Sequence, residues 1–83
     1  KKAGIHSLSI QYSTTLYSNI KNINEEVSRS CAHLISYSAE QIGSTETPTY
    51  RVNIVIRSIN IEAESHIINY IQQQPQVLLE KVD

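Results

Sequence analysis

The residues best suited to chemistry are three histidines, His6, His33 and His66, and a single cysteine, Cys31. A metal site or a nucleophilic centre needs such groups in a defined constellation, and no histidine forms a spaced motif with another His, Cys or carboxylate. His66 follows Glu62 by four residues, a spacing typical of a surface pair on a helix. No Ser/His/Asp arrangement can be recognised among the many serines. The sequence therefore predicts no catalytic residue, no metal site and no cofactor.

Composition disfavours two further classes of function. Gly4 and Gly43 are the only glycines, so the chain has no Gly-rich loop to hold a phosphate. Lys plus Arg is 7 and Asp plus Glu is 8, a formal net charge of −1, which excludes nucleic-acid binding through bulk charge. The stretch Arg-Val-Asn-Ile-Val-Ile-Arg over 51–57 lacks the aromatic side chains on which RNA-recognition motifs stack bases. We expect no nucleic-acid partner.

The apolar residues repeat with two periods, which define the elements that would position a site. Strict alternation predicts strands over 6–12 and 50–57, and a third apolar run predicts a last strand over 76–82. Spacings of three and four residues predict two helices, with the apolar sets Leu16, Ile20, Ile23, Val27 and Cys31, and Ala63, Ile67, Ile68 and Ile71. Cys31 is expected to be a small buried hydrophobe, and Glu62, Glu64 and His66 are expected mostly off the second apolar stripe.

Residues 32–42 show a weaker alternation. The more apolar set is Ile35, Tyr37, Ala39 and Gln41, which predicts a strand that is polar on one face and lies at a sheet edge. A turn is expected over 43–48, Gly-Ser-Thr-Glu-Thr-Pro. Asn60 is expected to cap the second helix and Pro75 to end it. A Ser or Thr within 13–15 is expected to accept a hydrogen bond from the start of the first helix.

The predicted order is strand, helix, strand, strand, helix, strand, over a single domain of residues 1–83. Right-handed crossovers place both helices on one face of the sheet. The fold class is therefore α+β, a ferredoxin-like βαββαβ sandwich with an antiparallel sheet of order 4-1-3-2. The first and third strands alternate most sharply and would be central, whereas the second would be an edge.

A sheet covered by helices on one face leaves its other face open. That face would carry Ser7, Ser9, Gln11, Arg51, Asn53, Val55 and Arg57. It is polar with few charges, so it is either solvated or paired with another sheet in a dimer. Arg51, Asn53, Val55 and Arg57 are the candidate interface residues.

The order of elements resembles that of ACT domains, small regulatory modules of metabolic enzymes. ACT domains that bind amino acids usually carry an Asp-x-x-Gly-like turn after the first strand, whereas this chain has Tyr-Ser-Thr-Thr-Leu over 12–16, without glycine. The resemblance implies that a small-molecule effector would bind beside Ser13, Thr14 and Thr15.

Nearly the whole chain is also similar to the C-terminal cytoplasmic ACT-like domain of the MgtC family, bacterial membrane proteins linked to magnesium stress and virulence. The similarity is one of pattern and length. It rests on a strand from His6, a long first helix without a preceding glycine, a turn with Ser, Thr and Pro, Tyr-Arg-Val-Asn-Ile over 50–54, Ile-Ile-Asn-Tyr-Ile over 67–71 and a strand over 77–82. The family's domain follows the last membrane helix, which would account for the missing Met and for Lys1 and Lys2. Its functional residues lie mostly in the membrane part, so no site residue is implied here.

We therefore expect a non-catalytic regulatory or interaction domain, a fragment of a longer protein. As the tail of an MgtC-type membrane protein associated with magnesium transport, it would lie on the cytoplasmic side of the membrane. It would act by pairing with itself or with another protein. The alternative is an ACT-type effector domain that binds a small molecule such as an amino acid, and a small ferredoxin-like enzyme is a third hypothesis. No apolar run in the chain approaches the ~18–20 residues that cross a bilayer.

Overall fold

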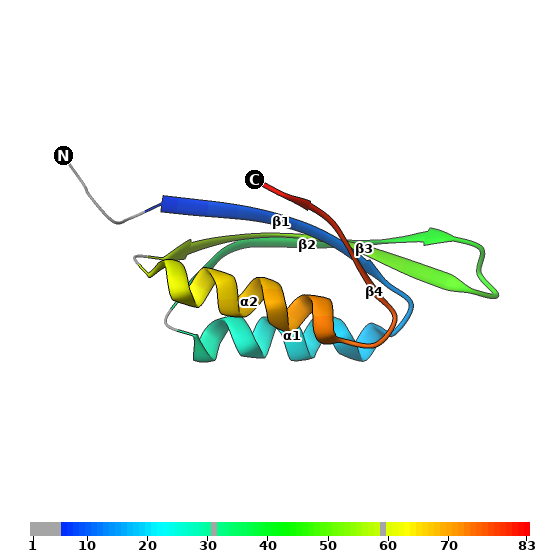
Figure 1. The fold of residues 1–83 in the computed structure, drawn as a ribbon. Coiled ribbons are helices and arrows are strands. Elements are labelled where there is room, and N and C mark those ends of the chain that lie inside the picture. The colour runs from blue at the N-terminus through cyan, green and yellow to red at the C-terminus, as the bar shows by residue number, and fades with distance from the viewer. Residues whose placement is uncertain (1–5, 31, 59) are drawn as a thin grey trace.

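The computed structural model describes residues 6–30, 32–58 and 60–83. Along the described chain the elements are β1 (His6–Thr14), α1 (Tyr17–Arg29), β2 (His33–Gly43), β3 (Pro48–Ser58), α2 (Ile61–Gln73) and β4 (Val77–Val82). The order is the predicted one. Both helices lie side by side against the same face of the sheet (Figure 1).

The four strands form one antiparallel sheet in the order β2-β3-β1-β4. This confirms the predicted α+β ferredoxin-like fold and its strand order. The two strands with the sharpest alternation, β1 and β3, pair at the centre from His6 opposite Ser58 to Thr14 opposite Tyr50. The weakly alternating β2 is an edge strand, as predicted, and β4 forms the other edge.

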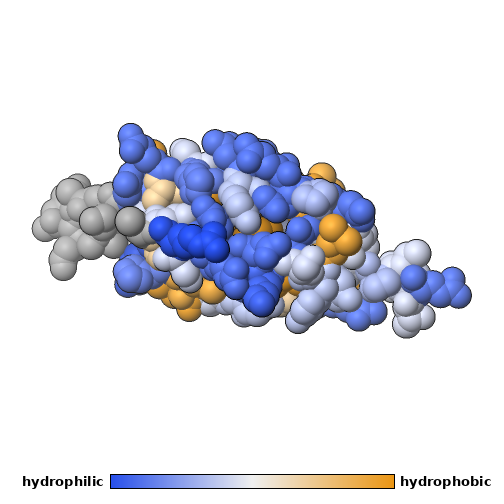
Figure 2. Space-filling view, turned by 90° about the horizontal axis from the view of Figure 1, so that it is seen from below, coloured by the Kyte–Doolittle hydropathy of each residue, from blue (hydrophilic) through white to orange (hydrophobic). Residues whose placement is uncertain are grey.

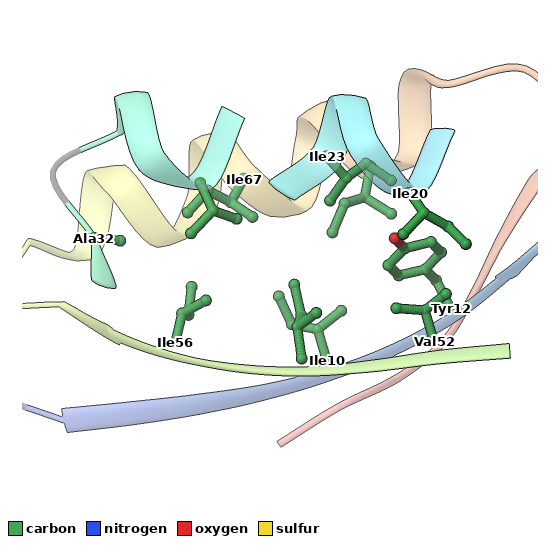
Figure 3. Close-up of a cluster of buried hydrophobic side chains, with 11 residues drawn as sticks. Ile10, Tyr12, Ile20, Ile23, Ala32, Val52, Ile56 and Ile67 are labelled. Carbon is green, nitrogen blue, oxygen red and sulfur yellow. The ribbon is translucent and has the colours of Figure 1, made fainter. Parts of the chain in front are cut away.

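The core lies between the sheet and the two helices, and Figure 3 shows its side chains meeting there. It contains Ile10 and Tyr12 of β1, Val52, Ile54 and Ile56 of β3, Ile20, Ile23 and Val27 of α1, and Ile67 and Ile71 of α2, with Ala32 beside them. Burying one such aliphatic side chain contributes about 1.5–3 kcal/mol to folding. The predicted apolar stripes therefore form the core, while Cys31 lies outside the described residues.

The two helices begin differently. The Asn60 side chain accepts a hydrogen bond of 2.8 Å from the Glu62 backbone N–H, so the predicted cap of α2 is confirmed. The N-cap of α1 is Leu16, which makes no side-chain cap hydrogen bond. Thr14 instead accepts a hydrogen bond from the Leu16 N–H, 3.1 Å away and one residue before the helix. The capping prediction for 13–15 is therefore wrong in its detail, because β1 continues through Thr14.

Two other local predictions fail for identifiable reasons. Leu34 pairs with Ile56 and Ser36 pairs with Val55, so Ile35 is an extra residue in a β-bulge. The bulge puts Leu34, not Ile35, on the same face as Tyr37. Glu64 of α2 is 8% exposed although it lies off the apolar stripe, so burial on this helix extends beyond the stripe.

Candidate functional site

The residues predicted to hold an effector, Ser13, Thr14 and Thr15, all line one open cavity of about 400 Å³. Its other walls are Thr49 at the start of β3 and Gln76, Val77 and Leu78 at the start of β4. The antiparallel pairing of β1 with both neighbours brings these segments together at one end of the sheet. The lining combines the hydroxyl groups of Ser and Thr and one amide side chain with the apolar Val77 and Leu78, and it carries no charged side chain.

The hydroxyl groups in this cavity are not equivalent. Thr14 is 2% exposed, and its Oγ1 accepts hydrogen bonds from the Leu16 N–H and from Asn19 Nδ2, the latter 2.9 Å away. Asn19 also donates to the Pro75 carbonyl at 2.8 Å, which ties the start of α1 to the end of α2. Thr15 is exposed and its hydroxyl contacts Gln76 Oε1. Thr14 therefore holds the local fold together, and Thr15 and Gln76 are the groups that a ligand could reach.

The open face of the sheet has the predicted register, with Ser7 opposite Arg57, Ser9 opposite Val55 and Gln11 opposite Asn53. Sequence reasoning missed one participant, Glu80 of β4. Its Oε1 accepts hydrogen bonds from Gln11 Nε2 at 2.9 Å and from Arg51 Nε at 3.1 Å. The hydrogen bond from Gln11, followed by the hydrogen bond and the charge of Arg51, holds the pKa of Glu80 below its ordinary value. Arg51 is thus engaged within the domain across three strands.

Large apolar side chains are exposed beside the other sheet edge. We name Tyr17, Leu34, Ile35 and Tyr37 the β2 surface; their exposed fractions are 64%, 37%, 47% and 43%. A groove of about 340 Å³ between α1 and β2 is lined by Tyr17, Ile20, Lys21, Asn24, Glu25, Ser28 and Tyr37. Seen from the helix side, the molecule is largely hydrophilic with separate hydrophobic patches (Figure 2). The weak alternation of β2 indicated an edge, but it did not mark this strand as a binding surface.

The predicted surface pair of His66 with Glu62 is replaced by a contact between the helices. His66 Nε2 of α2 lies 2.5 Å from Glu26 Oε2 of α1, and Arg29 Nη1 donates to Glu26 Oε1 at 2.9 Å. The hydrogen bond from His66, followed by its charge and by Arg29, keeps the pKa of Glu26 below its ordinary value. The cluster links the outer surfaces of the two helices.

In the described part of the chain, no group of three His, Cys, Asp or Glu side chains is placed to hold a metal ion. Neither of the helices there is long and apolar enough to pass through a bilayer.

No protein-family model matches this sequence, and no curated protein matches it. Solved structures do match. The C-terminal domain of the MgtC protein from Mycobacterium tuberculosis is 8% identical with a TM-score of 0.68, covering 100% of this chain and 88% of that chain. The ACT domain of GTP pyrophosphokinase from Chlorobium tepidum is 10% identical with a TM-score of 0.66, covering 99% and 97%. An uncharacterized protein from Thermotoga maritima is also 10% identical with a TM-score of 0.66, covering 95% of each chain.

These matches define the class of fold. The chain shares the ACT-like βαββαβ arrangement over nearly its full length, and the MgtC domain is one of several structural neighbours at low identity. At 8–10% identity the likeness concerns the fold and carries no residue roles.

Proposed function

We propose that this chain is a non-catalytic regulatory domain that works through protein–protein contact. The observation that carries the proposal is the β2 surface, where four large apolar side chains lie beside a sheet edge. An edge strand presents unpaired backbone N–H and C=O groups, which form hydrogen bonds with a partner strand. Backbone pairing and apolar burial at one place would supply both the directionality and the affinity of a contact.

We further propose that the domain is the cytoplasmic tail of an MgtC-type membrane protein linked to magnesium transport. The support is the full-length structural match to the MgtC C-terminal domain together with the pattern and length of the sequence. The test is the native gene: several apolar segments of ~20 residues before Lys1 would support a membrane anchor. A catalytic domain there would point instead to a regulator of a metabolic enzyme.

The contact is tested by site-specific photocrosslinking of the native full-length protein in cells. A photoreactive aromatic residue at Tyr37, which is 43% exposed, is expected to give a discrete protein adduct. The matched control is Asn53 on the open face of β3, which is exposed and should give little or none. Equal adducts at both positions, or none at Tyr37, would refute the proposal.

A second function is supported by the cavity beside Ser13, Thr14 and Thr15, whose hydroxyl-rich wall suits a small polar effector. The test is thermal unfolding with a panel of amino acids. A ligand at 100 times its dissociation constant should stabilise the domain by about 2.7 kcal/mol. Thr15→Val should abolish that shift, whereas Thr45→Val, in the turn after β2, should leave it intact. No shift with any amino acid would argue against an amino-acid effector.

A further inference from the structure

We propose that one end of the open sheet face, where Arg57, His33 and Ser7 lie side by side, binds the phosphate groups of an anionic phospholipid membrane. We name these three residues the Arg57 cluster. This inference rests on the proposed function, because it names the surface that would lie against the membrane in the tail of a membrane protein.

Strand pairing assembles the Arg57 cluster. Arg57 of β3 lies opposite Ser7 of β1 on one side and opposite His33 of β2 on the other. Opposed residues of antiparallel strands have Cα atoms about 4.5–5.5 Å apart, and their side chains leave the sheet on the same face. All three residues are exposed. The cluster therefore presents a guanidinium group, an imidazole and a hydroxyl in one row across three strands.

The cations of the open face differ in whether a carboxylate neutralises them. Arg51 lies 3.1 Å from Glu80, and Lys81 lies 3.5 Å from Asp83. Within the described residues, by contrast, no ion pair or side-chain hydrogen bond engages Arg57. Its guanidinium remains available to an external anion. A guanidinium fork matches two phosphate oxygens, and the neighbouring hydroxyl and imidazole can donate further hydrogen bonds, so phosphate is the group that this cluster suits.

The acidic side chains at the same end of the molecule belong to the helix layer. Glu62 and Glu64 are in the first turn of α2, and Glu26 of α1 contacts His66 and Arg29. Figure 1 shows both helices on one side of the sheet, whereas the open face is on the other side. Negative charge is thus separated from the Arg57 cluster by the sheet, which favours the approach of an anionic surface to the open face.

The start of the chain places this end of the sheet next to the proposed membrane anchor. β1 begins at His6, and only five residues precede it, including Lys1 and Lys2. Six residues span no more than about 22 Å even when fully extended. An anchor that ends just before Lys1 would therefore hold the Arg57 cluster close to the lipid headgroups, together with two lysines. Each basic residue near an anionic membrane surface strengthens binding by about fivefold.

The experiment is co-sedimentation of the 83-residue chain with lipid vesicles at low ionic strength. One set of vesicles is phosphatidylcholine alone, and the other contains equal parts of phosphatidylcholine and phosphatidylglycerol. The chain is expected to bind only the vesicles that contain phosphatidylglycerol, and added salt should release it. Arg57→Gln should weaken this binding about fivefold, because one basic contact is lost.

Arg51→Gln is the matched control for Arg57→Gln. The two arginines lie on the same face of β3, and both substitutions change the net charge equally, but Glu80 already neutralises Arg51. The Arg51→Gln variant should therefore bind the vesicles nearly as well as the parent. Far-UV circular dichroism should be unchanged in both variants.

Four results would overturn the membrane contact: no binding of the parent to phosphatidylglycerol vesicles, equal binding to neutral vesicles, an Arg57→Gln variant that binds like the parent, or equal losses in both arginine variants. The native gene tests the proposed function separately. A gene without membrane segments would refute the anchor whatever the vesicles show. Membrane segments in the gene, with vesicles that do not bind, would leave the anchor standing and remove only the contact through the Arg57 cluster.

Discussion

The two edge strands of the sheet, β4 and β2, differ in how well they are protected against pairing with a further strand. β4 has six residues, a register shift where it pairs with β1, and three charged groups at its end, in Glu80, Lys81 and Asp83. All three are engaged: Glu80 contacts Gln11 and Arg51, and Lys81 and Asp83 pair with each other at 3.5 Å. β2 is almost twice as long, carries one formal charge and exposes Leu34, Ile35 and Tyr37.

This difference shows that the open edge at β2 is not a general property of the fold. Both strands pair with a central strand on one side only, and each pairing has one register shift. β4, however, is shorter and carries the charges that oppose the addition of a further strand. The charged residues that protect β4 could equally stand in β2, but β2 carries only one. The length of β2, its single formal charge and its exposed apolar side chains therefore indicate an edge that suits a partner.

The substitution with the largest expected effect on stability tests whether both edge strands depend on the core at the centre of the sheet. Ile54 is fully buried on β3, opposite Ile10 of β1 and Tyr37 of β2. Ile54→Asp places a charge in the core and should lower the free energy of unfolding by at least about 4 kcal/mol, unfolding most of the protein. Urea denaturation measures it.

The adjacent residue provides the control for that substitution. Asn53→Asp, on the open face, should change the free energy of unfolding by no more than about 0.5 kcal/mol. Equal destabilisation by Ile54→Asp and Asn53→Asp would mean that the assigned faces of β3 are wrong.

The central strands were predictable because their periodicity reflects a single requirement. Each of β1 and β3 has one face against the helices and one face open, so every second residue must be apolar. Asn60 was predictable for a local reason, since its side chain satisfies an N–H two residues away. Strand order followed from the same two patterns, because the strands with the sharpest alternation need covered neighbours on both sides.

Features that depend on contacts between distant elements were not predictable. Glu26 and His66 are 40 residues apart in the sequence, and only the packing of α1 against α2 brings them together. Glu80 likewise reaches Gln11 and Arg51 through the strand order. The bulge at Ile35 changes the pairing of β2 by one residue, which no alternation within the strand reveals. The cavity walls contributed by Thr49 and Gln76 were not predicted either, because they too depend on contacts between distant elements.

The second prediction concerns a buried hydroxyl of the core, that of Tyr12 on β1. Tyr12 is fully buried, and its hydroxyl has no hydrogen-bond partner among the described residues. Tyr12→Phe should raise the free energy of unfolding by about 1 kcal/mol, because it removes a buried polar group and keeps the ring. Thermal unfolding measures it. Tyr17→Phe, at an exposed ring, should shift stability by less than about 0.5 kcal/mol; a loss of stability in Tyr12→Phe would reveal a hydrogen bond.

The third prediction tests how much the charge of Glu80 on β4 contributes to the stability of the domain. A carboxyl whose pKa is lowered by folding stabilises the native state above its unfolded pKa of about 4.3, and this contribution disappears as the pH falls through the lower folded value. Glu80→Gln should therefore be less stable than the parent at pH 7, and the difference should vanish in acid. Urea denaturation at a series of pH values measures this. A difference for Glu80→Gln that stays constant across the pH series would show that its charge is not responsible.

The smallest effect on unfolding should come from placing a lysine on each edge, and it separates the two edges most directly. Ile35 of β2 and Leu78 of β4 are both large, apolar and exposed, at 47% and 63%. Ile35→Lys and Leu78→Lys should each change the free energy of unfolding of the monomer by no more than about 0.5 kcal/mol, because neither side chain is in the core. Their effects on association should differ, since only β2 lacks charges that oppose strand addition. Photocrosslinking from Tyr37 should give less protein adduct in the Ile35→Lys variant and an unchanged amount in the Leu78→Lys variant, whereas equal loss would mean that both edges are available for pairing.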